Sequence, residues 1–257
     1  MALGSRARPR EGEAILRLGR GKEAFGYTLA GRPFWSDQPI LCLGPPQARA
    51  PLPERLAASA PAFEGETDTE DPDGFEERAL GPPILLLLAA RAIWALHASA
   101  AVVRGRLFVF LGESGRGKST LAALAYPEWE RAADDLLPFE LVRGRLVAHL
   151  DYPQLKLDPP RRIHAPTPVA ALIALAGPGS AEEPQLAPLR PAETARLLLG
   201  QTVSARRYGP ELLAAHLEAC VSAATLVPAY TLELPRDLAR LSEAGRCVSE
   251  LVEPAEP

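Results

Sequence analysis

The chain begins with short apolar stretches that alternate with glycine and proline. Residues 12–43 contain "AILRLG", "AFGYTLAG" and "PILCLG", a pattern typical of a few β-strands joined by tight turns. A proline-rich stretch follows at residues 45–61, and residues 64–77, "EGETDTEDPDGFEE", are acidic and show no periodicity. This composition favours a flexible loop or linker over an acidic recognition segment.

Longer apolar runs follow in the middle of the chain. Residues 84–96 predict a largely buried helix, and residues 97–112 contain two apolar runs around "RGR", which predict a pair of strands. Residues 119–126 have a helical composition that stops at a proline. Residues 129–150 predict three short strands, the last two around another "RG" turn.

The C-terminal third has the clearest helical patterning. "AETARLLLG" and "PELLAAHLEACVSAATLV" are amphipathic; the first helix ends at Gly200 and the second begins at Pro210. "AYTLEL" predicts a strand, and "PRDLARLSEA" predicts a closing helix. Strands and helices therefore share the main part of the chain, as in an α/β fold.

Composition narrows the class of protein. Of the 257 residues, 47% are hydrophobic and 23% are charged, which is enough to bury a core. A net charge of −4 provides no field that would attract nucleic acid. The longest apolar run contains Arg91 and is too short to span a bilayer, and the basic first ten residues precede no sustained apolar run. We therefore expect a cytoplasmic protein with no nucleic-acid or membrane partner.

A glycine-rich stretch between a predicted strand and a predicted helix carries the strongest chemical signal. Residues 112–120, "GESGRGKST", fit G-x-x-x-x-G-K-[ST], the pattern of a phosphate-binding loop, or P-loop. Its glycines let successive backbone N–H groups face a phosphate, and the helix N-terminus adds partial positive charge. In this chemistry Lys118 contacts the β- and γ-phosphates of ATP, and the Ser119 hydroxyl binds Mg²⁺. The predicted nucleotide-binding residues are Gly112, Glu113, Ser114, Gly115, Arg116, Gly117, Lys118, Ser119 and Thr120.

Lysine is rare in this chain, which makes the position of each lysine informative. There are 25 arginines and only three lysines, Lys22, Lys118 and Lys156. Lys118 lies in the P-loop, and we also assign a candidate site role to Lys156 in "DYPQLKL". Arg161 and Arg162 either supply positive charge to the γ-phosphate or to an acidic substrate, or form a solvated charged turn.

Two adjacent carboxylates follow the P-loop helix. "RAADDLLPFE" places Asp134 and Asp135 at the end of a short apolar stretch. One carboxylate can organise Mg²⁺, and a second can accept the proton of an attacking hydroxyl. Because adjacent strand residues point to opposite faces, only one of the two should aim directly at the nucleotide. We assign Asp134 as the base and Asp135 to the metal-bound water; a polar turn is the alternative.

The series "LHASAAVVRGRLFVFLGESGRGKST…RAADDLLP" resembles the catalytic core of the HPr kinase/phosphorylase family. A histidine heads a strand pair, "SG" stands inside the loop and "ADD" stands at the end of the next strand, over residues of about 95–140. The resemblance implies that His97 lies near the transferred phosphate. The chain departs from the family at Thr120, where an acidic residue is usual, and it has no counterpart of a downstream "RGLGIINV" signature. It looks closer to shorter HPr-kinase-like proteins, some of which modify peptides in clusters for ribosomal natural products.

These observations together predict an ATP-dependent kinase that transfers the γ-phosphate to a hydroxyl, with a serine of a small protein or peptide as the expected acceptor. The sequence has no LSGGQ-like element, which argues against a transporter ATPase, and no N-K-x-D element, which argues against a GTPase. The alternatives are a nucleotide-sensing module with little or no transfer and a small-molecule kinase; a homo-oligomer is left open. The predicted catalytic residues are Asp134, Asp135, His97 and Lys118, and the predicted metal ligands are Ser119 and Asp135.

The predicted fold is α/β, with a P-loop core of mixed β-sheet flanked by helices and a small strand-rich N-terminal segment. Residues 1–63 form that segment, residues 64–80 form an acidic flexible linker, and residues 81–257 form the HPr-kinase-like core.

Overall fold

The structure is a computed structural model. It describes residues 15–16, 22–30, 32–37, 40, 43, 46–51, 80–124, 129–154, 156–157, 166–176, 183–234, 237 and 240–251. The acidic segment at residues 64–77, together with Arg161 and Arg162, lies outside these ranges.

The chain divides into two compact units, Met1–Arg91 and Ala92–Pro257, and each is described by itself. The division falls after Arg91, so helix α3 (Pro82–Ala89) belongs to the first unit, whereas the sequence prediction placed residues from 81 onward in the core.

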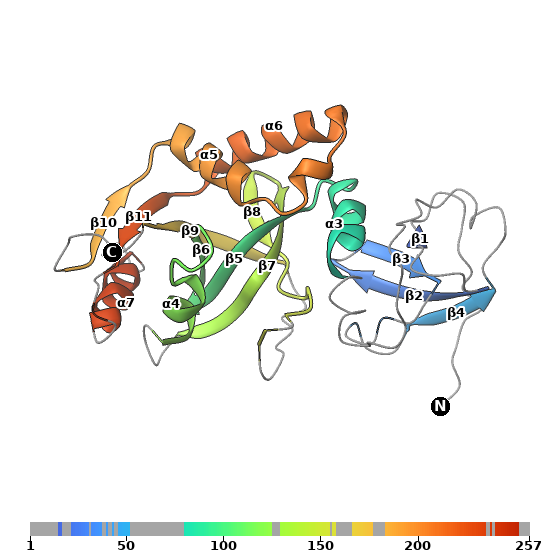
Figure 1. The fold of residues 1–257 in the computed structure, drawn as a ribbon, viewed down its shortest axis with the longest axis horizontal. Coiled ribbons are helices and arrows are strands. Elements are labelled where there is room, and N and C mark those ends of the chain that lie inside the picture. The colour runs from blue at the N-terminus through green and yellow to red at the C-terminus, as the bar shows by residue number, and fades with distance from the viewer. Residues whose placement is uncertain are drawn as a thin grey trace. The chain divides into compact units, whose positions relative to one another are not determined.

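The first unit contains a four-stranded sheet in the order β1-β3-β2-β4 (Figure 1). Strand β2 pairs antiparallel with both β3 and β4, and the rings of Tyr27 and Phe34 stack with centroids 5.7 Å apart. Three of the strands lie within residues 12–43, where strands were predicted, but β4 lies in the proline-rich stretch, where none was. The strands are β1 (Ile15–Leu16), β2 (Glu23–Leu29), β3 (Arg32–Ser36) and β4 (Ala48–Pro51).

The second unit is built on a seven-stranded sheet in the order β10-β11-β9-β6-β5-β7-β8 (Figure 1). Strands β6 and β11 run parallel to β9, and the remaining pairs are antiparallel, which confirms the predicted mixed sheet. Strand β8 also pairs with β9, so the strands from β9 to β8 close into a ring. The strands are β5 (Trp94–Val103), β6 (Arg106–Leu111), β7 (Glu130–Val142), β8 (Arg145–Ala148), β9 (Thr167–Leu175), β10 (Gln185–Pro188) and β11 (Ala229–Glu233).

Helices pack on both sides of strand β5. Odd-numbered residues such as Ala101 belong to the apolar cluster beneath α4 (Lys118–Leu124) and α7 (Leu241–Glu250). The even-numbered Trp94 faces the other way and packs on His216, with ring centroids 5.0 Å apart. His216 belongs to α6 (Pro210–Leu226), which follows α5 (Pro191–Gln201). No helix within the described ranges is long and apolar enough to cross a membrane.

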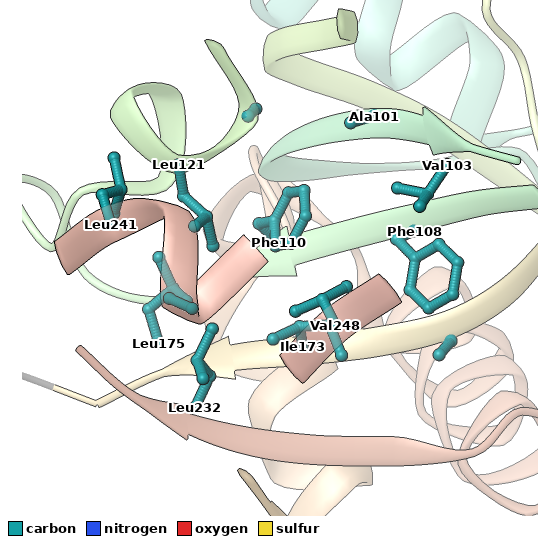
Figure 2. Close-up of a cluster of buried hydrophobic side chains, with 13 residues drawn as sticks. Ala101, Val103, Phe108, Phe110, Leu121, Ile173, Leu175, Leu232, Leu241 and Val248 are labelled. Carbon is teal, nitrogen blue, oxygen red and sulfur yellow. The ribbon is translucent and has the colours of Figure 1, made fainter. Parts of the chain in front are cut away.

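The core beneath α4 and α7 anchors the segment that matters for function. Figure 2 shows Leu121 of α4 and Val248 of α7 over Phe108 and Phe110 of β6 and Ile173 of β9, and all five are at most 1% exposed. Burial of each side chain of this size stabilises the fold by roughly 1.5–3 kcal/mol. The end of β6 and the start of α4 are therefore held firmly, and the loop between them starts and ends at fixed points.

The predicted helix at residues 84–96 is wrong beyond its first half. Helix α3 ends at Ala89, a turn with Ala92 at a φ of +57° follows, and β5 begins at Trp94. Neither glycine nor proline marks this break. A continuous apolar run gives the same pattern in a buried helix and a fully buried strand, so periodicity did not separate them.

The three strands predicted at residues 129–150 are two. Strand β7 runs unbroken through Pro138, and β8 follows the turn as expected. The carbonyl of Pro138 accepts a hydrogen bond from the backbone N–H of His149, just beyond the end of β8. The nitrogen of Pro138 faces the same side as this carbonyl, away from β5, so the missing N–H removes no hydrogen bond to β5. That placement lets the strand continue through a residue that usually ends one.

Candidate active site

A tight loop joins the end of β6 to the start of α4, as the sequence predicts. Its three glycines have φ angles of +145° at Gly112, +79° at Gly115 and +90° at Gly117, a region that glycine adopts without strain. A Cβ at Gly112 would also lie only 3.1 Å from the carbonyl oxygen of Leu175. The helix then starts at once, because Leu121 N–H donates to Gly117 O at 2.8 Å. The loop thus needs its glycines.

Lys118 folds back over the loop that precedes it. Its ammonium donates to the carbonyls of Gly112 at 2.7 Å and Glu113 at 3.1 Å, and the residue is only 6% exposed. Burial lowers the pKa of Lys118, and the carboxylates of Asp135 and Asp134 oppose that shift. A positive charge is therefore fixed where the loop meets α4.

A pocket of about 240 Å³ opens beside this loop. It lies between the loop, strands β5 and β7, and the short segment after β8 that carries Lys156. Its lining residues are His97, Ser99, Ser114, Gly115, Gly117, Lys118, Ser119, Thr120, Asp134, Asp135 and Lys156.

Asp134 accepts several hydrogen bonds within the pocket. Ser119 of the loop and Ser99 of β5 each donate a hydroxyl hydrogen bond of 2.6 Å to its Oδ1. Arg131 Nη2 donates to its Oδ2 at 2.5 Å. The side chain is 6% exposed, so a buried carboxylate is held in position by three hydrogen-bond donors.

Strand geometry explains why these donors meet Asp134. Ser99 and Asp134 lie directly opposite each other in the β5–β7 pairing. Arg131 would point to the other face in a regular strand, but β7 has a bulge, with Ala100 opposite Ala133 and Ala101 opposite Arg131. The extra residue restores the side chain of Arg131 to the face of Asp134.

The backbone of Asp134 is fixed as well. Its N–H donates to the side-chain oxygen of Gln154 at 2.7 Å. The amide nitrogen of Gln154 in turn donates to the carbonyls of Leu136 and Tyr152, at 2.9 and 3.1 Å. Gln154 therefore ties the segment that carries Lys156 to the strand that carries the aspartates.

Asp135 lies in the same pocket but in a more open place. Its side chain is 37% exposed; Oδ1 lies 3.1 Å from His97 Nδ1 and Oδ2 lies 2.9 Å from Lys156 Nζ. Its φ of +82° is unusual for a residue other than glycine. This angle breaks the alternation of the strand, so Asp134 and Asp135 both line the pocket. In a regular strand, adjacent residues would point to opposite faces; that only one of the two aspartates aims directly at the nucleotide stays a prediction.

Most of the predicted site residues come together in this pocket, but not all. His97, Lys118, Ser119, Asp134 and Asp135 line it, as do Ser114, Gly115, Gly117 and Thr120. Glu113 and Arg116 instead form a surface ion pair of 2.7 Å, and Gly112 contributes its carbonyl to Lys118.

Sequence reasoning missed three residues of the site, namely Ser99, Arg131 and Gln154. Ser99 had a usable signal: it lies two residues after His97 on a predicted strand, and therefore on the same face. Arg131 had none, because its orientation depends on the bulge. Gln154 acts through backbone contacts that no local pattern records.

Comparison with known proteins adds little. No protein-family model matches the chain, and no curated protein matches it. Among solved structures, the chain is similar to the Hpr(Ser) kinase/phosphatase from Coxiella burnetii, with 15% sequence identity and a TM-score of 0.34, over 62% of this chain and 93% of that chain. A similarity this distant carries no argument about function, and membership of the family stays a prediction from the sequence.

Proposed function

We propose that this protein is an ATP-dependent kinase that transfers the γ-phosphate to a hydroxyl group. The observation that carries the proposal is the hydrogen bond between Ser119 of the glycine loop and Asp134, next to a second, more exposed carboxylate in the same pocket. A binding module needs only the loop. Two carboxylates in different surroundings supply the two further tasks of phosphotransfer, which are metal binding and proton acceptance.

The loop serves as the cradle for the phosphates of ATP. The glycine conformations and the start of α4 present backbone N–H groups on one side of the pocket. Lys118 adds a buried positive charge at the same place. A phosphate oxygen is a stronger acceptor for this ammonium than the two loop carbonyls that it contacts, because charged partners make the shorter and stronger bonds.

Asp134 belongs to the metal side of the site. Ser119 and Asp134 offer hydroxyl and carboxylate oxygens within 2.6 Å of each other, and hard oxygen donors of this kind fit Mg²⁺. Mg²⁺, when bound, neutralises negative charge on the phosphate oxygens. Both oxygens of Asp134 already accept hydrogen bonds, two at Oδ1 from Ser99 and Ser119 and one at Oδ2 from the Arg131 guanidinium. A buried carboxylate held in this way beside Ser119 is well placed to bind the metal or a metal-bound water, and poorly placed to reach the hydroxyl of an incoming acceptor.

Asp135 belongs to the acceptor side. It is the more exposed carboxylate, and His97 lies against one of its oxygens. The sequence assigned the two roles the other way round, with Asp134 as base and Asp135 near the metal. The contacts favour the reverse, because the P-loop serine binds Asp134 and the open side of the pocket holds Asp135.

In the proposed step the acceptor hydroxyl oxygen forms a bond to the γ-phosphorus as the bond to the β-phosphate oxygen breaks. The hydroxyl proton passes to Asp135, and ADP is the leaving group. His97 orients the Asp135 carboxylate. The resemblance of the motif series supports a serine of a small protein or peptide as the acceptor.

The test is ADP release and phosphate incorporation from γ-labelled ATP, measured with and without serine-containing peptides and small hydroxyl compounds. A kinase of the proposed class labels a peptide and releases ADP faster when that peptide is present. Labelling of small compounds alone identifies a small-molecule kinase. Tight ATP binding without transfer to any acceptor identifies a nucleotide-sensing module and overturns the proposal.

A further inference from the structure

The two lysines of the second unit line the same pocket. Residues 92–257 contain 15 arginines but only two lysines, Lys118 and Lys156, and both face the cavity beside the glycine loop. None of the arginines in the described part of the unit lines it. Lysine differs from arginine in being a compact point charge with rotatable donors on a flexible stem. Both lysines of this unit therefore place such a charge in the pocket.

One partner of Lys156 is Asp135. The ammonium lies 2.9 Å from Asp135 Oδ2, and the lysine side chain is 59% exposed. An ion pair this exposed contributes little to stability. A stronger anion can therefore compete with Asp135 for Lys156, whereas Lys118 is held in the loop by two carbonyls.

We infer that Lys156 is a second phosphate-binding lysine, which moves from Asp135 to the terminal phosphate of the bound nucleotide. The inference rests on the proposed nucleotide site. Lys118 holds the polyphosphate at the loop end, and Lys156 holds the phosphate that is to be transferred. The same movement frees Asp135 Oδ2 to face the acceptor hydroxyl.

The order of contacts places Lys156 toward the terminal phosphate. From the loop outward, Ser119 contacts Asp134, Asp135 is the next residue, and Lys156 contacts Asp135. A P-loop encloses the inner phosphates, so the outermost phosphate extends along this path. There the terminal phosphate comes close to the negative charge of Asp135. The ammonium of Lys156, once it has moved to the phosphate, offsets the repulsion between these two anions.

The test compares ATP with its hydrolysis product. Lys156→Met keeps an unbranched side chain of similar bulk and removes the ammonium group with its charge. We expect the affinity for Mg·ATP to fall about tenfold, the scale of one charge-assisted hydrogen bond, and the affinity for Mg·ADP to stay within about twofold. Lys22→Met, which changes the remaining lysine at an exposed position of the first unit, should change neither affinity.

A double-mutant cycle tests the movement itself. Asp135→Asn removes the anion that competes for Lys156, so it should raise ATP affinity in the wild-type background more than in the Lys156→Met background. Equal gains in the two backgrounds mean that Asp135 acts only by repelling the phosphate, and they overturn the proposed exchange of partners.

The outcomes separate this inference from the proposed function. If wild-type protein binds neither ATP nor ADP, both are overturned. If it binds both nucleotides through Lys118 and Lys156→Met weakens neither, or weakens both equally, the role of Lys156 is wrong and the kinase proposal stands. Thermal unfolding of each variant shows that the measured protein is folded.

Discussion

Ser99 and Asp134 lie directly opposite each other on β5 and β7, and the serine hydroxyl donates to Asp134 Oδ1 at 2.6 Å. The same oxygen accepts from Ser119 of the loop, and the two hydroxyl oxygens are 3.5 Å apart. Three oxygens from three separate elements thus converge at one point of the pocket. Ser99 is fully buried, so it holds Asp134 in position from behind the loop.

Ser99→Ala should therefore weaken the response to Mg²⁺ more than the binding of nucleotide. Asp134 loses one of its two hydroxyl donors but keeps the bond to Ser119, so we expect the Mg²⁺ concentration for half-maximal transfer to rise several-fold. Loss of one buried hydrogen bond should also lower the free energy of unfolding by about 1 kcal/mol. Thr225→Ala, which removes an exposed hydroxyl on α6, is the matched control. An unchanged Mg²⁺ titration would show that Ser99 only supports the fold.

The two aspartates should fail in different ways. Asp135→Asn keeps the size of the side chain but takes up no proton, so transfer should fall by about 10² to 10⁴ with little change in Mg²⁺ dependence. Asp134→Asn should instead raise the Mg²⁺ requirement, because an amide oxygen is a weaker ligand than a carboxylate. Transfer rate and Mg²⁺ titration are measured for both variants. If Asp134→Asn loses transfer at saturating Mg²⁺ while Asp135→Asn remains active, the assignment from the sequence is the correct one.

Lys118→Ala should abolish nucleotide binding in a protein that remains folded. The glycines set the loop conformation, and the ammonium adds only two hydrogen bonds to loop carbonyls. Removal of a buried charge should cost little stability, because the desolvation of that charge is removed with it. Binding is measured by titration with ATP and folding by thermal melting. Normal ATP turnover by folded Lys118→Ala protein would refute the P-loop function.

The sequence predicted the parts of the site that depend on local patterns. The glycine loop, the strand before it and the helix after it follow from residues 106–124 alone. The spacing of the glycines, the lysine and the serine defines the loop, and the residues on either side of it have the composition of a buried strand and of a helix. The "ADD" element was found from its two adjacent carboxylates and from the family resemblance, but it lies inside β7 and not at a strand end. The sequence assigned the two aspartates the roles opposite to those that the contacts favour, because the pairing of β5 with β7 joins residues 35 positions apart in the chain.

Two of the errors in the fold have a common physical origin. Continuous apolar runs at residues 84–96 and 167–175 give no periodicity, because both faces of such a segment are buried. The first was predicted as one helix, and its second half is strand β5. No element was predicted for the second, which is β9, the strand that β6 and β11 join in parallel. Parallel pairing joins distant segments, and only tertiary packing determines it.

The backbone at Asp135 predicts that glycine is more stable there than alanine, the reverse of the usual order in a strand. At a φ of +82°, glycine is unstrained, whereas the Cβ of alanine is strained by about 1–2 kcal/mol. Asp135→Gly should thus be more stable than Asp135→Ala by about 1 kcal/mol. At Asp134, whose φ is not positive, the order should reverse, because glycine in a strand is less stable than alanine. Urea unfolding of the four variants measures both differences. If alanine is the more stable residue at both positions, Asp135 is not strained.

The buried histidine of α6 predicts how stability changes with pH. His216 lies 2.9 Å from Thr202 Oγ1 and 3.3 Å from Cys220 Sγ, and the rings of Trp94 and Tyr208 pack on it. Burial lowers its pKa, and it raises the pKa of Cys220 and of Tyr208 to about 12, so both of these neighbours are neutral below pH 8.

The sign of the effect follows from the lowered pKa. Below the ordinary histidine pKa of about 6.5, the unfolded chain takes up a proton that folded His216 resists. The stabilisation is therefore complete above that pH and is lost as the pH falls toward the folded pKa, by at most about 1.4 kcal/mol per pH unit. Urea unfolding between pH 5 and pH 8 measures the slope, and His216→Phe should reduce it. An acid slope that is identical in His216→Phe would place its origin in another group, and a wild-type protein that gains stability on acidification would contradict the direction itself.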